Sequence, residues 1–508
     1  MNADTREHLK DGGWIVGLIT LAYAALHLAV IGRYGWFRDE FYYIACGEHL
    51  DWGYVDHPPL IALIARLART LLGDSILAAR LPSVLAGAAV ILLAGRLARE
   101  LGGGRFAQAL AALCVVVGPV YLFSFHVLSM NSFDVLFWTL GAFVVVRILN
   151  TGNPQLWLLF GLVCGLGLEN KHSLLFFGFG VFTGLLLTPE RRQFRQPWIW
   201  IGGGLAAVLF LPHVLWQIVH GWPTAEFIRN ATAHKNVALS PLAFFAEQIK
   251  QMHPFTFPIW FAGLIWLFRS PKYRVLAWVY VAAFLVLITQ SSKAYYLAPV
   301  YPPLFAAGAV AFETWIRRPV LRAALAVVLL AGGALTAPLT LPVLTEEGFV
   351  RYAEALGIPL TAAERHDLGV LPQHYADMHG WEEIVAEVAR VYNTLPPEDK
   401  AKAGIYGQNY GEAGAVDLLG RRYGLPQAMS GHNNYFLWGP QGPSENTEIL
   451  IILGGDPEDH RQAFRDVRQA GEIRCGYCMP YENNQPVWIA RAPKGPIAEI
   501  WPMTKHYD

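Results

Sequence analysis

Long apolar runs alternate with short polar segments over the first two thirds of the chain, which predicts a bundle of membrane-spanning helices. Windows near ~20 residues give about eleven spans, at residues 14–33, 81–101, 106–124, 131–149, 155–169, 173–188, 198–219, 253–269, 275–291, 295–315 and 320–341. The first run is followed by no small-residue cleavage site. We therefore expect it to be retained as a span rather than removed as a signal peptide.

Basic residues between the runs predict the orientation of the bundle. Four clusters lie on one side of the predicted spans: Arg96, Arg99 and Arg105; Arg191, Arg192 and Arg195; Arg269, Lys272 and Arg274; Arg317, Arg318 and Arg322. The positive-inside rule makes that side cytoplasmic. The first outer loop, residues 34–80, carries further positive charges on the opposite side: Arg38, Arg66, Arg69 and Arg80. We expect that these positive charges on the outer side bind an anion.

The first outer loop contains two helical patterns of its own. Residues 39–50 form an aromatic-rich run, and residues 60–72 place apolar positions on one face and Arg66 and Arg69 on the other. This amphipathic pattern, with Trp36 and Trp52 close by, is typical of helices that lie in the membrane interface.

The pattern changes after about residue 342, where charges become frequent. Strand-like runs at 403–406, 448–453 and 487–491 alternate with helix-like runs at 411–423 and 457–470. Residues 343–508 are therefore predicted to form a small α/β domain. With the N-terminus inside the cytoplasm, an odd number of spans places this domain outside it.

Two short motifs in this region give little evidence for a functional site. Gly454-Gly455-Asp456 lacks the full dinucleotide-binding fingerprint and is predicted to be a turn. Cys475 and Cys478 lie in a strand-like stretch, where their side chains would face nearly opposite sides. They give only a weak signal for metal binding or redox chemistry.

Composition agrees with a membrane protein and excludes one class of partner. The chain of 508 residues is 54% hydrophobic and 15% charged, whereas globular domains average ~25% charge. Lys and Arg balance Asp and Glu, 39 against 39. Nothing in this charge balance points to a nucleic-acid partner.

Carboxylates at two predicted helix starts are candidates for chemistry. Arg38-Asp39-Glu40 follows the first span, and Asp134 opens the fourth. Both are expected on the outer side of the membrane. Helix capping is the alternative interpretation of each acid. Asp39 and Glu40 would point about 100° apart on a helix, so we do not expect them to share a role.

Cations are expected at the same depth. Lys171 and Lys293 lie in predicted outer turns, and Arg38 and Arg80 lie in the first outer loop. Each lysine side chain alone could simply snorkel to the interface. Together the four cations suit the phosphate of a lipid. Most histidines are scattered, but His57 lies within the first outer loop.

Several short motifs then occur in a recognisable order. They read RDEFYY at 38–43, YVDHPPL at 54–60, NSFD at 131–134, Lys171, and SKAYYLAPVYP at 292–302. In this order they resemble the family-39-type, GT-C membrane glycosyltransferases, whose relatives include protein O-mannosyltransferases and the aminoarabinose transferase of lipid A. The resemblance covers about residues 14–341. The tail beyond it does not clearly match the characterised members, which leaves the acceptor open.

The resemblance implies an α-helical polytopic membrane protein of GT-C type with a C-terminal extracytoplasmic α/β domain. It also implies transfer of a sugar from a polyprenyl-phosphate donor to an acceptor outside the cytoplasmic membrane. Asp39 matches the proposed base and Asp134 the second acidic position, with Glu40 as an uncertain neighbour. We assign Arg38, Arg80, Lys171 and Lys293 to the donor phosphate, and His57, Tyr42, Tyr295 and Tyr296 to substrate binding.

The implied chemistry is physically coherent. A carboxylate stabilises an oxocarbenium-like transition state, and phosphate is already a good leaving group. Direct displacement would invert the anomeric carbon. No cofactor follows from the sequence, and a divalent metal ion near the acids stays open without a ligand set.

Two other function classes stay open. One is a transporter or flippase of lipid-linked glycans that lacks catalytic activity. Transporters often carry internal repeats and ionisable groups at mid-span, whereas here the charges gather at one face. The other is a scaffold whose outer domain binds glycans. The expected partners are therefore a polyprenyl-phosphate sugar, membrane lipids and an unknown lipid, glycan or protein acceptor.

Overall fold

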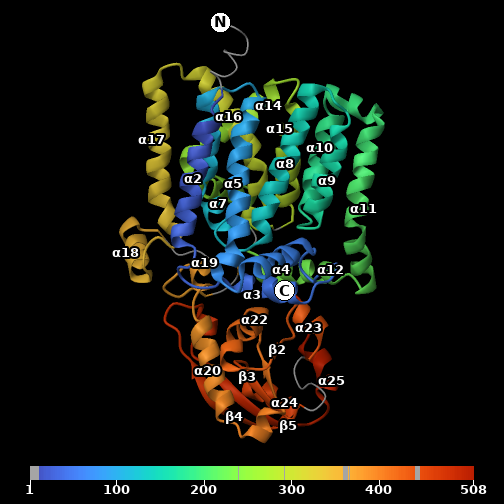
Figure 1. Ribbon diagram of the computed structural model, residues 1–508, viewed down its shortest axis with the longest axis vertical. Helices are drawn as coiled ribbons and strands as arrows, with labels where there is room; N and C mark the ends of the chain where they lie inside the picture. Colours follow the sequence, from blue (N-terminus) through green and yellow to red (C-terminus); the bar gives the residue numbers. More distant parts are fainter. Residues whose placement is uncertain (1–10, 238, 291, 359–363, 365–366, 441–446) are drawn as a thin grey trace.

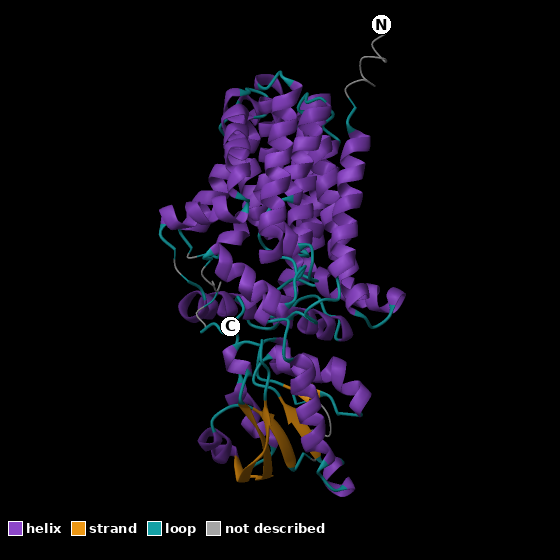
Figure 2. Cartoon of the chain, turned by 90° about the vertical axis from the view of Figure 1, so that its left-hand side faces the viewer, coloured by secondary structure: helices purple, strands orange, loops and turns teal. Residues whose placement is uncertain are grey.

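The structure is a computed structural model that describes residues 11–508 except 238, 291, 359–363, 365–366 and 441–446. Roughly parallel and antiparallel helices form a bundle, and a sheet with its own helices lies beyond one end of it (Figure 1). Figure 2 shows the same division from the side, with all strands gathered in the C-terminal part.

A helix lies at each position where a span was predicted. These helices are α2 Gly13–Val30, α5 Ile76–Glu100, α6 Arg105–Val116, α8 Met130–Thr151, α9 Leu156–Leu168, α10 Leu174–Leu186, α11 Pro197–Val219, α14 Phe257–Arg269, α15 Arg274–Ile288, α16 Tyr301–Trp315 and α17 Pro319–Thr336. Within the described residues, five helices are long and apolar enough to cross a membrane, or six if α10 and the bent segment after it count as one. The number of spans therefore stays a prediction.

Glycines let neighbouring helices of the bundle pack backbone against backbone. A Cβ on Gly161 of α9 would lie 2.1 Å from the carbonyl oxygen of Gly202 on α11. Gly263 of α14 and Gly308 of α16 make the same close approach, with a Cβ on Gly308 only 1.9 Å from the oxygen of Ile259. Close contact between small residues replaces the hydrophobic driving force that is weak between helices in lipid.

Both helices predicted in the first outer loop are present, as α3 Arg38–Glu48 and α4 Leu60–Leu72. They lie at the end of the bundle that faces the sheet (Figure 1). Helix α4 buries Ile61, Ala62, Ala65 and Ala68 and leaves Leu67 and Leu71 exposed. Other short helices at this end are α12 Pro223–Asn230, α18 Glu346–Leu356 and α19 Gln373–Ala376 (Figure 1), and α13 Pro241–Gln251 follows α12 in the chain.

The C-terminal part contains a five-stranded sheet in the order β2-β1-β3-β5-β4. The strands are β1 Ala403–Tyr406, β2 Ala428–Met429, β3 Ile449–Leu453, β4 Phe464–Ile473 and β5 Gln485–Pro493. Strand β1 pairs in parallel with β2 and β3, and β5 is antiparallel to β3 and β4. Its helices include α20 Trp381–Asn393, α22 Tyr410–Leu419, α23 Asn434–Trp438 and α24 Pro457–Ala463.

One predicted element of this part is wrong. The helix expected over 457–470 ends at Ala463, and the chain continues as the edge strand β4. Pairing of β4 with β5 along residues 464–473 overrides the helical pattern there. The predicted turn before α24 is present, with Gly454 and Gly455 at φ of 61° and 76°, values that favour glycine.

A shared hydrophobic core joins the C-terminal part to the first outer loop. Phe41 of α3 lies edge-on to Trp381 of α20, with ring centroids 5.4 Å apart. A Cβ on Gly414 of α22 would lie 2.7 Å from the Cβ of Phe41, so the two helices touch. Helix α3 is thus held between the bundle and the sheet, and its N-terminus lies at their junction.

The buried carboxyl of Asp417 predicts a pH-dependent stability of the C-terminal part. Asp417 accepts hydrogen bonds of 2.7 Å from the main-chain N–H of Ala428 and from the Tyr435 hydroxyl. Burial raises the pKa of Asp417 to about 7. The folded state therefore holds a proton that the unfolded chain, with an Asp pKa of about 4, releases between those values.

We expect this contribution of Asp417 to be present at pH 5 and lost as pH rises through 7. In Asp417→Asn the titrating group is gone, so the stability of the variant relative to wild type should increase between pH 5 and pH 8. Thermal unfolding of both purified proteins in detergent measures this difference. A constant difference at the two pH values would contradict the prediction.

Candidate functional site

The first turn of α3 places three charged neighbours in three different environments. The side chain of Asp39 is 32% exposed, that of Arg38 only 11%. Glu40 is fully buried. Successive residues point about 100° apart on a helix, which separates the three groups as the sequence predicts. Of the three, Asp39 is the carboxylate that a substrate in solution or in the interface can reach.

Glu40 and Arg80 form a buried ion pair. Arg80 Nε lies 2.8 Å from Glu40 Oε1, and both side chains are 0% exposed. Arg80 also donates to the carbonyl oxygens of Ile31 and Gly35. Glu40 accepts from the main-chain N–H groups of Phe37 and Leu128. The geometry does not fit the predicted roles of Arg80 as a phosphate ligand and Glu40 as a catalytic group, because neither reaches the surface.

Other arginines of the first outer loop also have carboxylate partners. Arg69 pairs with Glu48 at 2.7 Å and with Asp74 at 2.5 Å. Arg38 lies 3.6 Å from Asp377. The positive charges on the predicted outer side are thus largely balanced within the protein. A bound anion, which the sequence analysis called for, is not needed to explain Arg69 and Arg80.

The carboxylate of Asp39 contacts the C-terminal part directly. The hydroxyl of Tyr410, at the start of α22, donates a hydrogen bond of 2.8 Å to Asp39 Oδ1. Burial raises the pKa of Tyr410 well above its ordinary value, so the hydroxyl stays a donor. Arg38 Nε lies 3.6 Å from the same oxygen. Tyr410 was not predicted as a site residue, because no local sequence signal connects residues so far apart in the chain.

Arg38 is held in place by groups from the C-terminal part. Its main-chain N–H donates to the carbonyl of Asp377 at 3.0 Å, and its Nη1 donates to the Tyr481 hydroxyl at 2.8 Å. Burial raises the pKa of Asp377 to about 6, and the guanidinium of Arg38 opposes this increase. Arg38 is therefore fixed beside Asp39 rather than free to swing.

Lys293 faces a carboxylate that sequence analysis also missed. Its Nζ lies 2.7 Å from Glu364 Oε1. Lys235 Nζ lies 3.7 Å from the same oxygen, and Arg38 Nη2 lies 3.7 Å from Glu364 Oε2. Burial acts to lower the pKa of Lys293, but the charges of Tyr296, Glu364 and Asp39 raise it overall. Three cations from distant segments thus converge on one buried carboxylate close to Asp39.

Lys171 and Asp134 lie together on the bundle side of this junction. Lys171 Nζ donates to Asn131 Oδ1 at 2.6 Å and lies 3.7 Å from Asp134 Oδ2. The ammonium also lies over the ring of Tyr296, 4.5 Å from its centroid, and 6.0 Å from that of Tyr295. Asp134 is almost completely buried and accepts from the Ser173 hydroxyl. In this conformation it holds Lys171 rather than facing a substrate.

Tyr42 and His57 are buried and support other side chains. The hydroxyl of Tyr42 donates to Asp56 Oδ1 at 2.8 Å, and its ring stacks on that of Tyr410 with centroids 4.7 Å apart. His57 lies with Nδ1 2.8 Å from the carbonyl of Pro58. Both are almost inaccessible, so the predicted substrate contacts do not fit this conformation. Tyr295 and Tyr296 are half-buried and remain candidates for such contacts.

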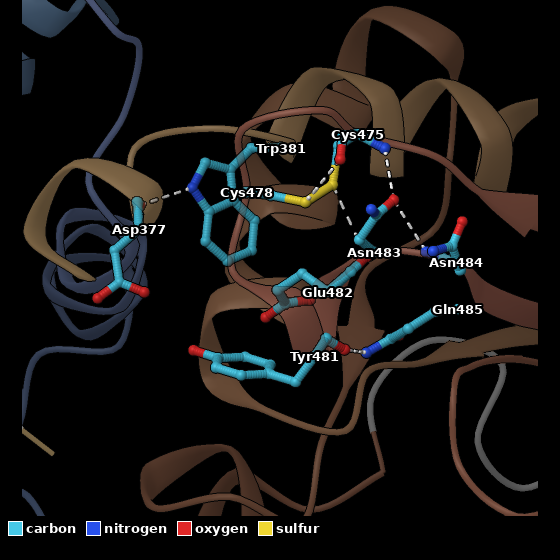
Figure 3. Close-up of a disulfide and its surroundings, with 9 residues drawn as sticks. All are labelled: Asp377, Trp381, Cys475, Cys478, Tyr481, Glu482, Asn483, Asn484 and Gln485. Carbon is cyan, nitrogen blue, oxygen red and sulfur yellow. Dashed lines mark hydrogen bonds between the residues drawn. A yellow bond between two sulfur atoms is a disulfide. The ribbon is translucent and has the colours of Figure 1, made fainter. Parts of the chain in front are cut away.

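A disulfide closes the turn that precedes Tyr481. Cys475 and Cys478 are joined, contrary to the predicted strand geometry in which they would face apart. Strand β4 ends at Ile473, so the two cysteines lie in a turn that brings their side chains together. Figure 3 shows Tyr481 and Glu482 just after this turn, with Trp381 donating from its ring to the carbonyl of Asp377.

Among the described residues, one group brings three metal-ligating side chains together: His432, His506 and Asp508, whose ligand atoms lie within 4.8 Å of one another. The main-chain N–H of Tyr410 donates to Nδ1 of His432 at 3.4 Å. The proton of that ring is then on Nε2, which faces the carbonyl of Asp508 at 3.0 Å. Main-chain groups thus occupy both ring nitrogens of His432.

Comparison with known proteins shows what this chain is similar to. Residues 56–216 match the model of the dolichyl-phosphate-mannose-protein mannosyltransferase family. The lipid A galacturonosyltransferase RgtD of Rhizobium johnstonii is 26% identical over 51% of this chain. That alignment spans 56% of the relative, so the chain matches little more than half of its length.

Solved structures share the fold over nearly the whole chain. ArnT from Cupriavidus metallidurans, in a crystal structure bound to undecaprenyl phosphate, aligns with a TM-score of 0.62 at 14% identity, covering 94% of this chain and 98% of that chain. The arabinofuranosyltransferase AftD from Mycobacteria aligns with a TM-score of 0.54 at 14% identity, covering 95% of this chain and 40% of the other. The family model, the relative and AftD are all named as glycosyltransferases, so this chain is similar to proteins of that class.

Proposed function

We propose that this protein transfers a sugar from a polyprenyl-phosphate donor to an acceptor at the outer face of the cytoplasmic membrane. The observation that carries the proposal is the position of Asp39. It is a reachable carboxylate at the junction of bundle and sheet, with Arg38 beside it and Lys293 close enough for its charge to act on that ammonium group. The base is thus close to the cations that would bind a phosphate.

In this mechanism Asp39 accepts the proton of the acceptor nucleophile as that nucleophile attacks the anomeric carbon. The bond from that carbon to the phosphate oxygen breaks, and the phosphate leaves with the electron pair. Direct displacement from the opposite side inverts the configuration. The hydrogen bond from Tyr410 and the nearby Arg38 orient Asp39 for this step.

Cations supply the rest of the chemistry. A phosphate leaving group gains negative charge in the transition state, and fixed ammonium and guanidinium groups stabilise it in a site that is partly shielded from water. We assign the stabilisation of the leaving phosphate to Lys293 and Arg38. Lys171, whose ammonium lies over the ring of Tyr296, is a further cation on the bundle side. Arg80 is left out, because Glu40 and two carbonyl oxygens occupy its donors.

Two features support the proposed orientation. Helix α2 begins at the end of the bundle opposite the sheet (Figure 1), as the basic clusters predict. The disulfide between Cys475 and Cys478 suits an oxidising compartment. Residues 343–508 would then form an extracytoplasmic domain, and the protein would lie in the inner membrane. The relatives reported above are named as transferases, and nothing here favours a transporter.

A binding experiment tests the donor class. Purified protein in detergent should bind undecaprenyl phosphate, and Lys293→Met should weaken this binding about tenfold, the loss expected for one charge-assisted contact. Lys402→Met removes a surface lysine that pairs with Glu448 far from Asp39 and serves as the matched control. Absence of binding by the folded wild-type protein would overturn the proposal.

A comparison of envelope lipids and glycans tests the identity of the acceptor. The relative named as a lipid A galacturonosyltransferase makes a lipid A-like glycolipid the first acceptor to try. Mass spectrometry of envelope lipids and glycans from a deletion strain and its parent identifies the sugar and acceptor together. An unchanged glycolipid profile with a changed glycan or protein profile would move the acceptor to that class.

A further inference from the structure

The carboxylate of Glu364 lies where three cations meet. Lys293 Nζ is 2.7 Å and Lys235 Nζ 3.7 Å from its Oε1, and Arg38 Nη2 is 3.7 Å from its Oε2. The side chain is only 6% exposed and also accepts a hydrogen bond of 3.0 Å from Gln373 Nε2. Four donors from four segments thus surround one small anion.

We propose that Glu364 is an internal substitute for the donor phosphate, and that the phosphate displaces its carboxylate from the cations when the donor binds. This inference rests on the proposed function and adds two residues to it: Glu364 as the competing anion and Lys235 as a third phosphate ligand. A carboxylate and a phosphate use the same donors, since both accept two or more hydrogen bonds from ammonium and guanidinium groups.

The charge balance of the cluster supports an exchange. Arg38, Lys235 and Lys293 carry three positive charges, and Asp39, Asp377 and Glu364 carry up to three negative ones. A sugar linked through a phosphodiester has one negative charge, as does a carboxylate. Adding the donor without moving Glu364 would leave excess negative charge in a partly buried site, which is costly. Exchanging one anion for the other keeps the balance.

The position of the cations allows the exchange to occur by movement of the Glu364 side chain alone. Lys235 ends the short helix at Ala231–Lys235, and the next residue, Asn236, forms an isolated backbone bridge with Glu364. The backbone of Glu364 is therefore anchored beside Lys235 while its side chain reaches Lys293. Rotation of this side chain alone would release the ammonium groups, without any rearrangement of the bundle.

Affinity for undecaprenyl phosphate tests the proposal, because removal of a competing anion should increase binding. We expect Glu364→Gln, which keeps the size of the side chain and removes its charge, to bind undecaprenyl phosphate about tenfold more tightly than wild type. Glu364→Asp keeps the charge and should bind like wild type. Lys235→Gln should bind more weakly. Native mass spectrometry or microscale thermophoresis on the full chain in detergent measures all four proteins.

A matched control separates this effect from a general change in charge. Glu346→Gln removes a carboxylate at the same end of the bundle that pairs with His379 at 3.3 Å, and it should leave the affinity unchanged. Unchanged or weaker binding by a folded Glu364→Gln protein would overturn the inference while leaving the donor assignment intact. If neither wild type nor Glu364→Gln binds, the proposed donor itself fails.

Discussion

Replacing Asp39 by Asn is expected to lower the rate of sugar transfer by about 10²–10⁴-fold, the usual contribution of a general base. The amide keeps the shape of the side chain and can still accept from Tyr410, but it cannot take a proton from the acceptor. Binding of undecaprenyl phosphate should change little, because the phosphate contacts cations rather than Asp39. The measurement is kcat for transfer beside the donor Kd.

The control for this substitution is Asp74→Asn in the same outer loop. Asp74 pairs with Arg69, and its side chain is 54% exposed. Its removal should leave the transfer rate unchanged, which excludes a general effect of losing negative charge from the loop. An Asp39→Asn protein that folds, binds donor and transfers sugar at the wild-type rate would show that Asp39 is not the base.

Replacing Arg80 by Met is expected to destabilise the protein by about 3–5 kcal/mol, because it leaves the carboxylate of Glu40 buried without its partner. Glu40 would keep the N–H groups of Phe37 and Leu128 but lose two charged contacts. Thermal or denaturant unfolding in detergent gives the change. The start of α3 would loosen with it, so activity should fall in proportion to the loss of folded protein.

Arg69→Met is the matched control for this effect. Arg69 belongs to the same outer loop and also has two carboxylate partners, but Asp74 is half exposed. Ion pairs open to solvent contribute about 0–1 kcal/mol, so the loss should be small. Equal destabilisation by the two substitutions would mean that the burial of the Glu40–Arg80 pair has no special weight.

The sequence predicted the elements of the bundle better than it predicted the site. The sequence marks α3 by its aromatic-rich run and α4 by apolar and charged positions that alternate with helical periodicity, and the structure has both helices. The contact between Tyr410 and Asp39 depends on packing between segments 371 residues apart, for which a single sequence carries no signal. The same holds for Glu364, which has no motif around it.

Charged residues were the hardest to interpret from sequence. Arg38 and Arg80 belong to the same predicted loop and have the same side chain. Arg38 lies beside the partly exposed carboxylate of Asp39, whereas Arg80 is buried in an ion pair with Glu40. Burial decides between binding a ligand and supporting the fold, and burial is a property of the tertiary structure. The cysteine pair illustrates the same limit, because the end of β4 at Ile473 determines whether the two thiols can meet.

The contacts between the C-terminal part and Arg38 have a practical consequence for the design of truncated proteins. A chain cut after residue 342 would lose Asp377, Tyr410, Tyr481 and Glu364 together. Arg38, Lys235 and Lys293 would then face the lipid headgroups with few counter-charges, and the apolar ring of Phe41 would lose Trp381. Truncated or chimeric versions should therefore exchange the first outer loop and the C-terminal part as one unit.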